Sequence, residues 1–248
     1  MTEFITTPQG RRIAVKRQDG AGPGIVFLHG LKSDMEGTKA VALAEWAAAQ
    51  GRAFLRYDAS GHGQSGGRFE EGAIGDWFED ALAAIRACSR GPQVLVGSSM
   101  GGWLSLLIAR AHPELVAGMV TIAAAPDFTE DGFWASFTAA QRQALARFGH
   151  VDLPSDYGAP YRISQRLIEE GRGRLVLRDP LALPMPVRFL QGTEDSSVPV
   201  ETALRLFGHV SGPDIRLTLV KGADHRFSTP DNMAQIEAAV QEVLSRIG

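Results

Sequence analysis

The sequence predicts an α/β protein with a mostly parallel central sheet and helices on both of its faces. Over most of the 248 residues, short apolar runs alternate with stretches of helical spacing. Some of these runs, such as 24–28 and 115–124, are continuously apolar, which is typical of strands buried on both faces. Strands that alternate with helices pair in parallel, because each helix carries the chain back across the sheet.

The elements are expected in a regular order, with Gly51, Gly91-Pro92 and Pro113 as stop signals for three helices. We expect strands at residues 4–7, 11–16, 24–28, 53–57, 93–96, 115–124, 187–191 and 215–220. We expect helices at residues 38–50, 74–89, 100–112, 200–210 and 231–247.

The alternation stops at Pro126 and resumes after residue 180. Between these points no strand is convincing, and the segment is rich in aromatic and charged residues that suggest several short helices. We therefore predict a core formed by 1–126 and 180–248, with a helical lid inserted at 127–179.

Composition excludes several classes of protein. Hydrophobic residues make up 44% and charged residues 21%, as in an ordinary globular domain. The net charge of −3 gives no basic field for nucleic acid. The single cysteine, Cys88, cannot form an internal disulfide, and no His/Asp/Glu cluster has the spacing of metal ligands. We expect no metal and no cofactor.

Residues 1–16 contain no charged leader followed by an apolar block, so we expect no secretory signal and a cytoplasmic location. The most apolar run, 116–126, is too short to cross a bilayer, so we expect no integral membrane segment. The oligomeric state stays open.

The residues Gly97-Ser98-Ser99-Met100-Gly101 match the motif G-x-S-x-G. They stand between an apolar strand and an amphipathic helix, where the motif turns the chain sharply and exposes the serine oxygen at the helix N-terminus. We therefore predict Ser99 as a nucleophile and treat Ser98 as its neighbour. The alternative is an ordinary glycine-rich turn.

Residues 29–31 follow the apolar strand 24–28. In hydrolases with the G-x-S-x-G motif, this loop and the residue after the nucleophile supply backbone N–H groups to the oxyanion. The sequence thus predicts an oxyanion hole made by the amides of Leu31 and Met100. We expect a structural role for the His29 ring.

A serine hydroxyl needs a base, and His225 is the best placed of the six histidines, between the last strand and the last helix. His62, in a glycine-rich loop, is a weaker candidate.

The base needs an acid to orient it. Asp195 and Glu194, after strand 187–191, both qualify by position, and Asp127 is a third possibility. The chain order Ser99, Asp195, His225 is the order that G-x-S-x-G hydrolases use.

On these residues the sequence resembles the α/β-hydrolase superfamily along its whole length. The spacing Asp195-x-x-Val198-Pro199 is similar to the superfamily's acid loop, which favours Asp195 over Glu194. Residues 58–65 resemble the superfamily's structural glycine loop, which makes His62 a still weaker candidate for the base.

A closer resemblance is to the branch of mitochondrial palmitoyl-protein thioesterases and acyl-glucuronide esterases. It is carried by residues 37–40, 56–58, 60–61, 95–103 and 224–226. The resemblance implies cofactor-free hydrolysis of acyl thioesters or activated esters, on a small molecule or an acylated protein.

Aromatic and apolar side chains of the insertion either line an acyl pocket or form the lid's own core, and Trp134 and Phe137 are our first pocket candidates. The full set is Phe128, Phe133, Trp134, Phe137, Leu145, Phe148, Tyr157 and Tyr161.

The rival activities are those of a small-molecule carboxylesterase and, behind it, a carbon–carbon bond hydrolase. Dehalogenases and epoxide hydrolases of this fold use an aspartate nucleophile, so Ser99 argues against both. A rival from another class is a non-catalytic binding protein on the same fold.

Overall fold

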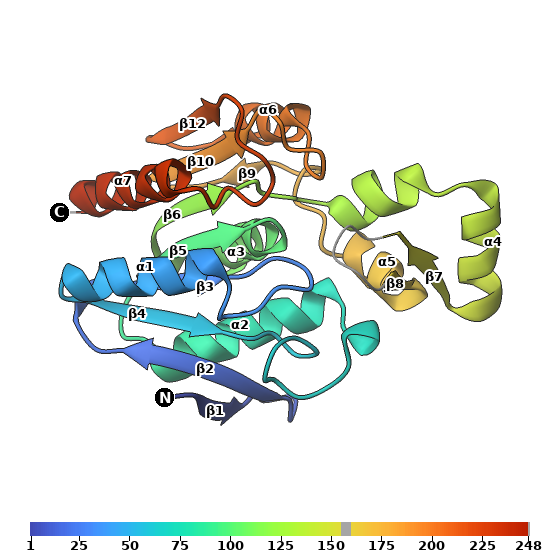
Figure 1. Cartoon of the computed structure of the whole chain (residues 1–248), viewed down its shortest axis with the longest axis horizontal. Helices are drawn as coiled ribbons and strands as arrows, with labels where there is room; N and C mark the ends of the chain where they lie inside the picture. Colours follow the sequence, from blue (N-terminus) through green and yellow to red (C-terminus); the bar gives the residue numbers. More distant parts are fainter. Residues whose placement is uncertain (155–159, 248) are drawn as a thin grey trace.

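The computed structural model describes residues 1–154 and 160–247, and an eight-stranded sheet forms its centre (Figure 1). The strand order is β1-β2-β4-β3-β5-β6-β10-β12. β1 and β2 are antiparallel to their neighbours, whereas the pairs from β4 onward are parallel. The strands are β1 (Glu3–Thr6), β2 (Arg12–Gln18), β3 (Ala21–Leu28), β4 (Arg52–Tyr57), β5 (Gln93–Ser98), β6 (Val116–Ile122), β10 (Val187–Gly192) and β12 (Ile215–Val220).

Helices cover both faces of the sheet, which confirms the predicted fold class (Figure 1). On one face, α1 (Thr38–Ala49) and α7 (Pro230–Arg246) bury a core that includes Leu43 and Ile236. The other face is covered by α2 (Ile74–Cys88), α3 (Met100–Ala111) and α6 (Val200–His209). The central strands β5 and β10 are thereby buried on both faces, as continuous apolar runs require.

Element ends differ from the expected ones by a few residues. β5 extends to Ser98, because Gly97 and Ser98 still pair with Thr121 and Ile122 of β6 before the chain turns. Four further elements are too short to leave a periodic signal in the sequence. They are η1 (Phe69–Glu71), η2 (Pro113–Leu115) and the paired strands β9 (Leu181–Ala182) and β11 (Val210–Ser211).

The insertion forms a lobe beyond the end of the sheet (Figure 1), and the expectation that it contains no strand is wrong. Strands β7 and β8 form an antiparallel hairpin in which buried Val151 lies opposite buried Ile163. Both strands alternate polar and apolar residues, HVDL and YRIS, so the sequence contains a short strand signal that the prediction of a helical segment missed. The lobe consists of the π-helical turn η3 (Phe128–Trp134), α4 (Ala139–Phe148), β7 (His150–Leu153), β8 (Tyr161–Ser164) and α5 (Gln165–Arg172).

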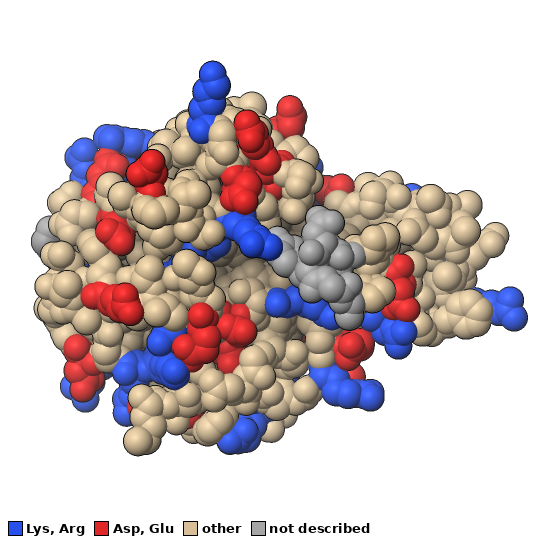
Figure 2. Space-filling view, viewed as in Figure 1, with Lys and Arg blue, Asp and Glu red and all other residues tan. Residues whose placement is uncertain are grey.

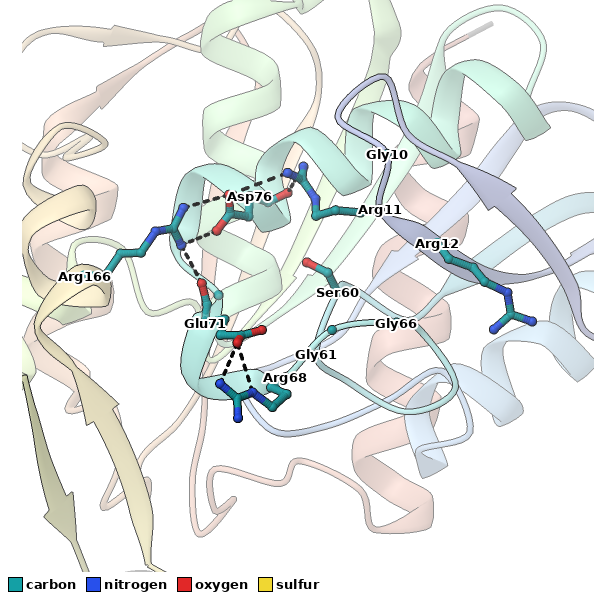
Figure 3. Close-up of a pocket in the computed structure, with 12 residues that line it drawn as sticks. Gly10, Arg11, Arg12, Ser60, Gly61, Gly66, Arg68, Glu71, Asp76 and Arg166 are labelled. Atoms are coloured by element: carbon teal, nitrogen blue, oxygen red, sulfur yellow. Dashed lines mark hydrogen bonds and ion pairs between the residues drawn. The ribbon is translucent and has the colours of Figure 1, made fainter.

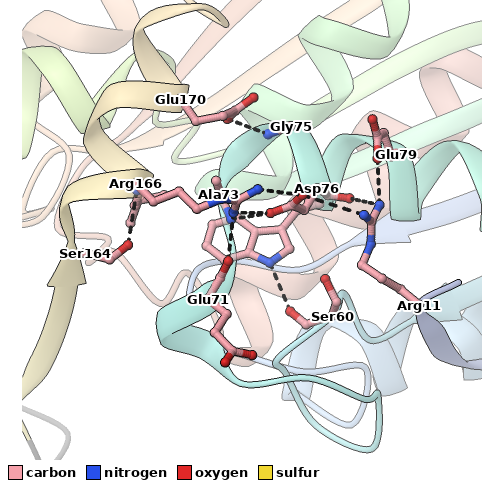
Figure 4. A network of polar contacts seen from close by, with 12 residues as sticks. Arg11, Ser60, Glu71, Ala73, Gly75, Asp76, Glu79, Ser164, Arg166 and Glu170 are labelled. Atoms are coloured by element: carbon pink, nitrogen blue, oxygen red, sulfur yellow. Dashed lines mark hydrogen bonds and ion pairs between the residues drawn. The ribbon is translucent and has the colours of Figure 1, made fainter. Parts of the chain in front are cut away.

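Polar contacts fix α5 of this lobe, the predicted lid, to the start of α2 (Figure 4). Glu170 Oε2 accepts the Gly75 N–H at 2.8 Å. Arg166 donates to Asp76 Oδ1 at 3.0 Å and to the Glu71 carbonyl at 2.7 Å. Carboxylates at a helix N-terminus are favoured by the helix dipole. Glu170 and Asp76 therefore both stabilise the start of α2 and hold α5 against it.

Candidate active site

Ser99 stands at the sharp turn between β5 and α3, with φ 54° and ψ −115°. This positive φ is strained for a residue with a side chain and is typical of functional sites. Glycines on both sides permit the close approach: a Cβ at Gly97 would lie 2.3 Å from the Gly101 carbonyl oxygen, and one at Gly101 would lie 2.0 Å from the Leu28 oxygen. The turn places Ser99 at the carboxyl end of a central strand and at the N-terminus of α3.

The base and acid candidates are directly joined. His225 Nδ1 lies 2.8 Å from Asp195 Oδ2. Asp195 Oδ1 accepts the N–H groups of Ser197 and Val198 at 2.9 and 2.8 Å. Burial opposes ionisation of Asp195, but these hydrogen bonds outweigh it and hold its pKa below the usual value. An ionised acceptor keeps the proton of His225 on Nδ1 and leaves Nε2 as the basic atom.

The sheet topology brings the predicted nucleophile and this pair to one edge. β5, β10 and β12 run parallel, and Ser99, Asp195 and His225 each follow the carboxyl end of one of them. Within the described parts of the chain, no hydrogen bond joins Ser99 to His225. Catalytic hydrogen bonds are often long before substrate binds and tighten in the complex.

The predicted oxyanion loop lies beside the nucleophile. A Cβ at Gly30 would lie 3.3 Å from Ser99 Cβ and 4.0 Å from Ser99 Oγ. The Gly30 carbonyl is bonded to His29 Nδ1 at 2.8 Å and accepts the Ser33 N–H at 3.1 Å. In a trans peptide the N–H points opposite to the C=O, so these bonds turn the Leu31 N–H away from His29 and Ser33.

The His29 ring has the structural role expected of it. The Ala59 N–H donates to His29 Nε2 at 3.0 Å, so the proton of the neutral ring is on Nδ1 and is donated to Gly30 O. Burial lowers the pKa of His29, which keeps the ring neutral. The second predicted donor, the Met100 N–H, belongs to the first turn of α3, where amides have no partner within the helix.

The other acid candidates have different surroundings. Glu194 is exposed, whereas Asp127 is fully buried and accepts the N–H groups of Val176 and Leu177 at 2.7 and 3.0 Å. Burial raises the pKa of Asp127. Asp127 thus ties the start of the lid to its end, which is a structural role.

His62 is a buried ring rather than an accessible base. Its Nδ1 lies 3.1 Å from the Ser60 carbonyl oxygen, and burial lowers its pKa to about 3. It packs edge-on against Trp77, with ring centroids 5.2 Å apart.

The two pocket candidates of the lid contact other lid residues. Phe137 is 5% exposed and stacks on Phe133, with centroids 6.5 Å apart. Trp134 has the guanidinium groups of Arg142 and Arg172 over its ring at 4.8 and 4.7 Å. These contacts fit the lid-core interpretation, and a role in binding an acyl chain stays a prediction. Among the other residues of the set, Tyr157 lies outside the described residues.

A cavity of about 470 Å³ lies beside the glycine loop that follows β4 (Figure 3). Carboxylates already pair with three of the arginines that line it. Arg11 contacts Asp80 at 2.7 Å, Arg68 contacts Glu71 at 2.6 Å, and Arg166 contacts Asp76. Ser99 is not among its lining residues, so this cavity is separate from the predicted nucleophile.

Charges of both signs are interspersed over the core on the face shown in Figure 2. In residues 1–154 and 160–247, no three His, Cys, Asp or Glu side chains gather as a metal site would require. None of the described helices is both long enough and apolar enough to span a membrane.

Comparison with known proteins agrees with this geometry. Residues 23–157, more than half of the chain, match the family described as serine aminopeptidase, S33. The chain is 35% identical to the mitochondrial palmitoyl-protein thioesterase ABHD10 of Rattus norvegicus over 98% of its own length and 82% of the relative's. The Homo sapiens protein of the same name is 32% identical over 98% of this chain and 80% of the relative.

Solved structures give the same result. A putative hydrolase from Agrobacterium vitis superposes with a TM-score of 0.93 at 38% identity and covers 98% of both chains. Mouse α/β-hydrolase domain-containing protein 10 superposes with a TM-score of 0.92 at 33% identity and covers all of both chains. The resemblance noted in the sequence is confirmed: the chain belongs to the serine aminopeptidase S33 family of α/β-hydrolases, within which it groups with the ABHD10 proteins, and it is a serine hydrolase.

Proposed function

We propose that this hydrolase cleaves acyl thioesters or activated esters through an acyl-enzyme on Ser99, with His225 as general base and Asp195 as the acid that orients it. The observation that carries the proposal is the 2.8 Å bond between His225 and Asp195, at the sheet edge where the strained turn presents Ser99. This arrangement is the one that activates a serine hydroxyl.

The reaction proceeds in two steps. Ser99 Oγ attacks the acyl carbonyl while His225 Nε2 takes its proton, and the oxyanion accepts the N–H groups of Leu31 and Met100. Collapse of this intermediate expels the thiol or alcohol, which takes the proton from His225. Water then attacks the acyl-enzyme with His225 again as base, and the carboxylic acid and free Ser99 are released.

The substrate class is inferred from the relatives. Proteins that are 32–35% identical over 98% of this chain are named palmitoyl-protein thioesterases, so we propose a medium or long acyl group, carried by a small molecule or a protein. A small-molecule carboxylesterase is the competing activity and would prefer short acyl groups.

Labelling with a fluorophosphonate probe tests the nucleophile. We expect the wild-type protein to be labelled at Ser99 and Ser99→Ala to lose both the label and hydrolysis, by on the order of 10⁶-fold in turnover. Ser98→Ala is the matched control, because Ser98 is the adjacent buried serine of the same turn, and it should keep both. A label that survives in Ser99→Ala would show that another residue is the nucleophile. A folded wild-type protein that neither reacts nor hydrolyses any acyl ester would favour the binding-protein alternative.

A further inference from the structure

The side chain of Lys39 reaches from the start of α1 to the loop that carries His225. Its ammonium Nζ donates to the Arg226 carbonyl oxygen at 2.5 Å, across 187 positions of sequence. Arg226 directly follows His225, and Lys39 lies in the first turn of the helix that follows the predicted oxyanion loop. One hydrogen bond therefore connects the helix that follows the predicted oxyanion loop to the loop that carries the predicted base.

The loop around His225 is a tight turn held at several points. Asp224 Oδ1 accepts the Phe227 N–H at 3.0 Å, and Phe227 adopts a positive φ of 49° with its ring fully buried. On its other side, the Gly222 N–H donates to Thr193 Oγ1 at 2.9 Å, next to the acid loop. The bond from Lys39 holds the peptide immediately after the imidazole.

A lysine is costly at this position in two respects. Burial, together with the nearby charge of Arg226, lowers the pKa of Lys39 to about 8, and the charge of Asp224 opposes this shift only in part. The positive end of a helix dipole also disfavours a cation in the first turn. An apolar side chain of the same length would avoid both penalties, so the ammonium group is explained by the bond to Arg226 and the attraction of Asp224.

We infer that Lys39 is a positioning residue of this hydrolase, whose hydrogen bond to the Arg226 carbonyl fixes the direction in which His225 presents Nε2 to Ser99. The inference rests on the proposed function, in which His225 is the general base. Lys39 acts on the orientation of the base and not on substrate binding, so its loss lowers kcat and leaves KM unchanged. A misplacement of about 1 Å at a catalytic group can cost on the order of 10²-fold in rate.

The charge of Lys39 adds a pH signature. The charged groups that face it are Asp224 and Arg226, and the imidazole of His225 belongs to the same loop. When Lys39 loses its proton near pH 8, a charge-assisted bond becomes an ordinary one of roughly half the strength. The wild-type kcat should therefore decline above about pH 8.

The test compares Lys39→Met with Lys221→Met, which removes an exposed lysine at the start of the same loop. We expect Lys39→Met to lower kcat for a p-nitrophenyl ester by roughly 10- to 100-fold with KM within about twofold, and to abolish the alkaline decline. Lys221→Met should match the wild type in both. The proton on His225 Nδ1, followed by NMR, should shift or broaden only in Lys39→Met.

A Lys39→Met variant with wild-type kcat and an unchanged alkaline decline overturns the inference. If that variant does not fold, Lys39→Arg decides: its guanidinium stays charged to high pH, so the decline should vanish, and an unmoved decline overturns the inference. These outcomes are separate from failure of the proposed function, which would appear as hydrolysis surviving in Ser99→Ala.

Discussion

His225 Nδ1 and Asp195 Oδ2 lie 2.8 Å apart, and the same carboxylate accepts the N–H groups of Ser197 and Val198. Hydrogen bonds within its own loop thus hold the Asp195 carboxylate in the position from which it contacts the imidazole. The ring is thereby fixed in the tautomer and orientation that general-base chemistry at Ser99 requires.

Replacing this acid should affect turnover far more than replacing its neighbour. Asp195→Asn keeps the size of the side chain but favours the wrong tautomer of His225, so kcat should fall on the order of 10⁴-fold. Glu194→Gln is the matched control, because Glu194 is exposed and adjacent, and its kcat should change little. A larger loss at Glu194, or at Asp127→Asn, would assign the acid elsewhere.

The same carboxylate should make part of the folding stability depend on pH. The folded-state pKa of Asp195 lies below its usual value, so its stabilising contribution is present above about pH 4 and is lost as pH falls through the folded-state pKa. Urea unfolding of the wild type and Asp195→Asn between pH 6 and pH 3 measures this. The difference in free energy of unfolding between the wild type and Asp195→Asn should shrink toward pH 3. A difference that stays constant with pH would contradict this prediction.

Sequence reasoning predicted a nucleophile and a base because both predictions depend on local patterns. Ser99 stands in a strand–turn–helix motif, and His225 follows the last strand of a parallel sheet, whose carboxyl ends share an edge. The choice among the acids depended on a resemblance, because burial distinguishes Asp195 from Glu194 and the sequence does not show burial.

Other features had a weak sequence signal or none. The β7–β8 hairpin has only four residues per strand, and its alternation was outweighed by the aromatic and charged residues around it. The tautomer of His29 depends on Ala59, and the role inferred for Lys39 depends on a contact across 187 positions. Such contacts are set by tertiary packing, so a single sequence does not reveal them.

His29 should matter for turnover although it touches no reacting atom in the proposed mechanism. His29→Phe removes the bonds to Gly30 O and from Ala59 N–H, which frees the peptide that carries the Leu31 N–H. Loss of one oxyanion donor costs roughly 10²- to 10³-fold in kcat, so we expect about 10²-fold with little change in KM.

His62→Phe is the control for this experiment. The two buried rings lie with centroids 4.9 Å apart, but Nδ1 of His62 bonds Ser60 rather than the oxyanion loop. The His62→Phe variant should therefore keep the wild-type kcat. Equal losses of kcat in both variants would mean that His29 acts only through packing.

The buried ring of Phe137 should stabilise the lid. Phe137→Ala removes a large side chain that is 5% exposed, so the free energy of unfolding should fall by about 3–5 kcal/mol, with faster proteolysis within residues 127–179. Phe148→Ala is the matched control, because that ring is 62% exposed and surface changes are usually within about 0.5 kcal/mol. Equal stability of the two variants would contradict the lid-core interpretation.

The length of the preferred acyl chain separates a long-chain thioesterase from a small-molecule carboxylesterase. Each methylene buried in the transition state is worth ~0.8 kcal/mol, or about fourfold in kcat/KM. We expect kcat/KM for p-nitrophenyl esters to rise from about two carbons until the pocket ends, at concentrations below micelle formation. An acetyl optimum would favour the carboxylesterase.

The same assay decides whether Trp134 lines the acyl pocket. Arg142 and Arg172 lie over its ring at 4.8 and 4.7 Å, so the ring already has two cation partners within the lobe. We therefore expect Trp134→Ala to keep the wild-type dependence of kcat/KM on chain length. A flattened dependence would instead return Trp134 to the pocket, because only a ring that contacts the chain can change the gain per methylene.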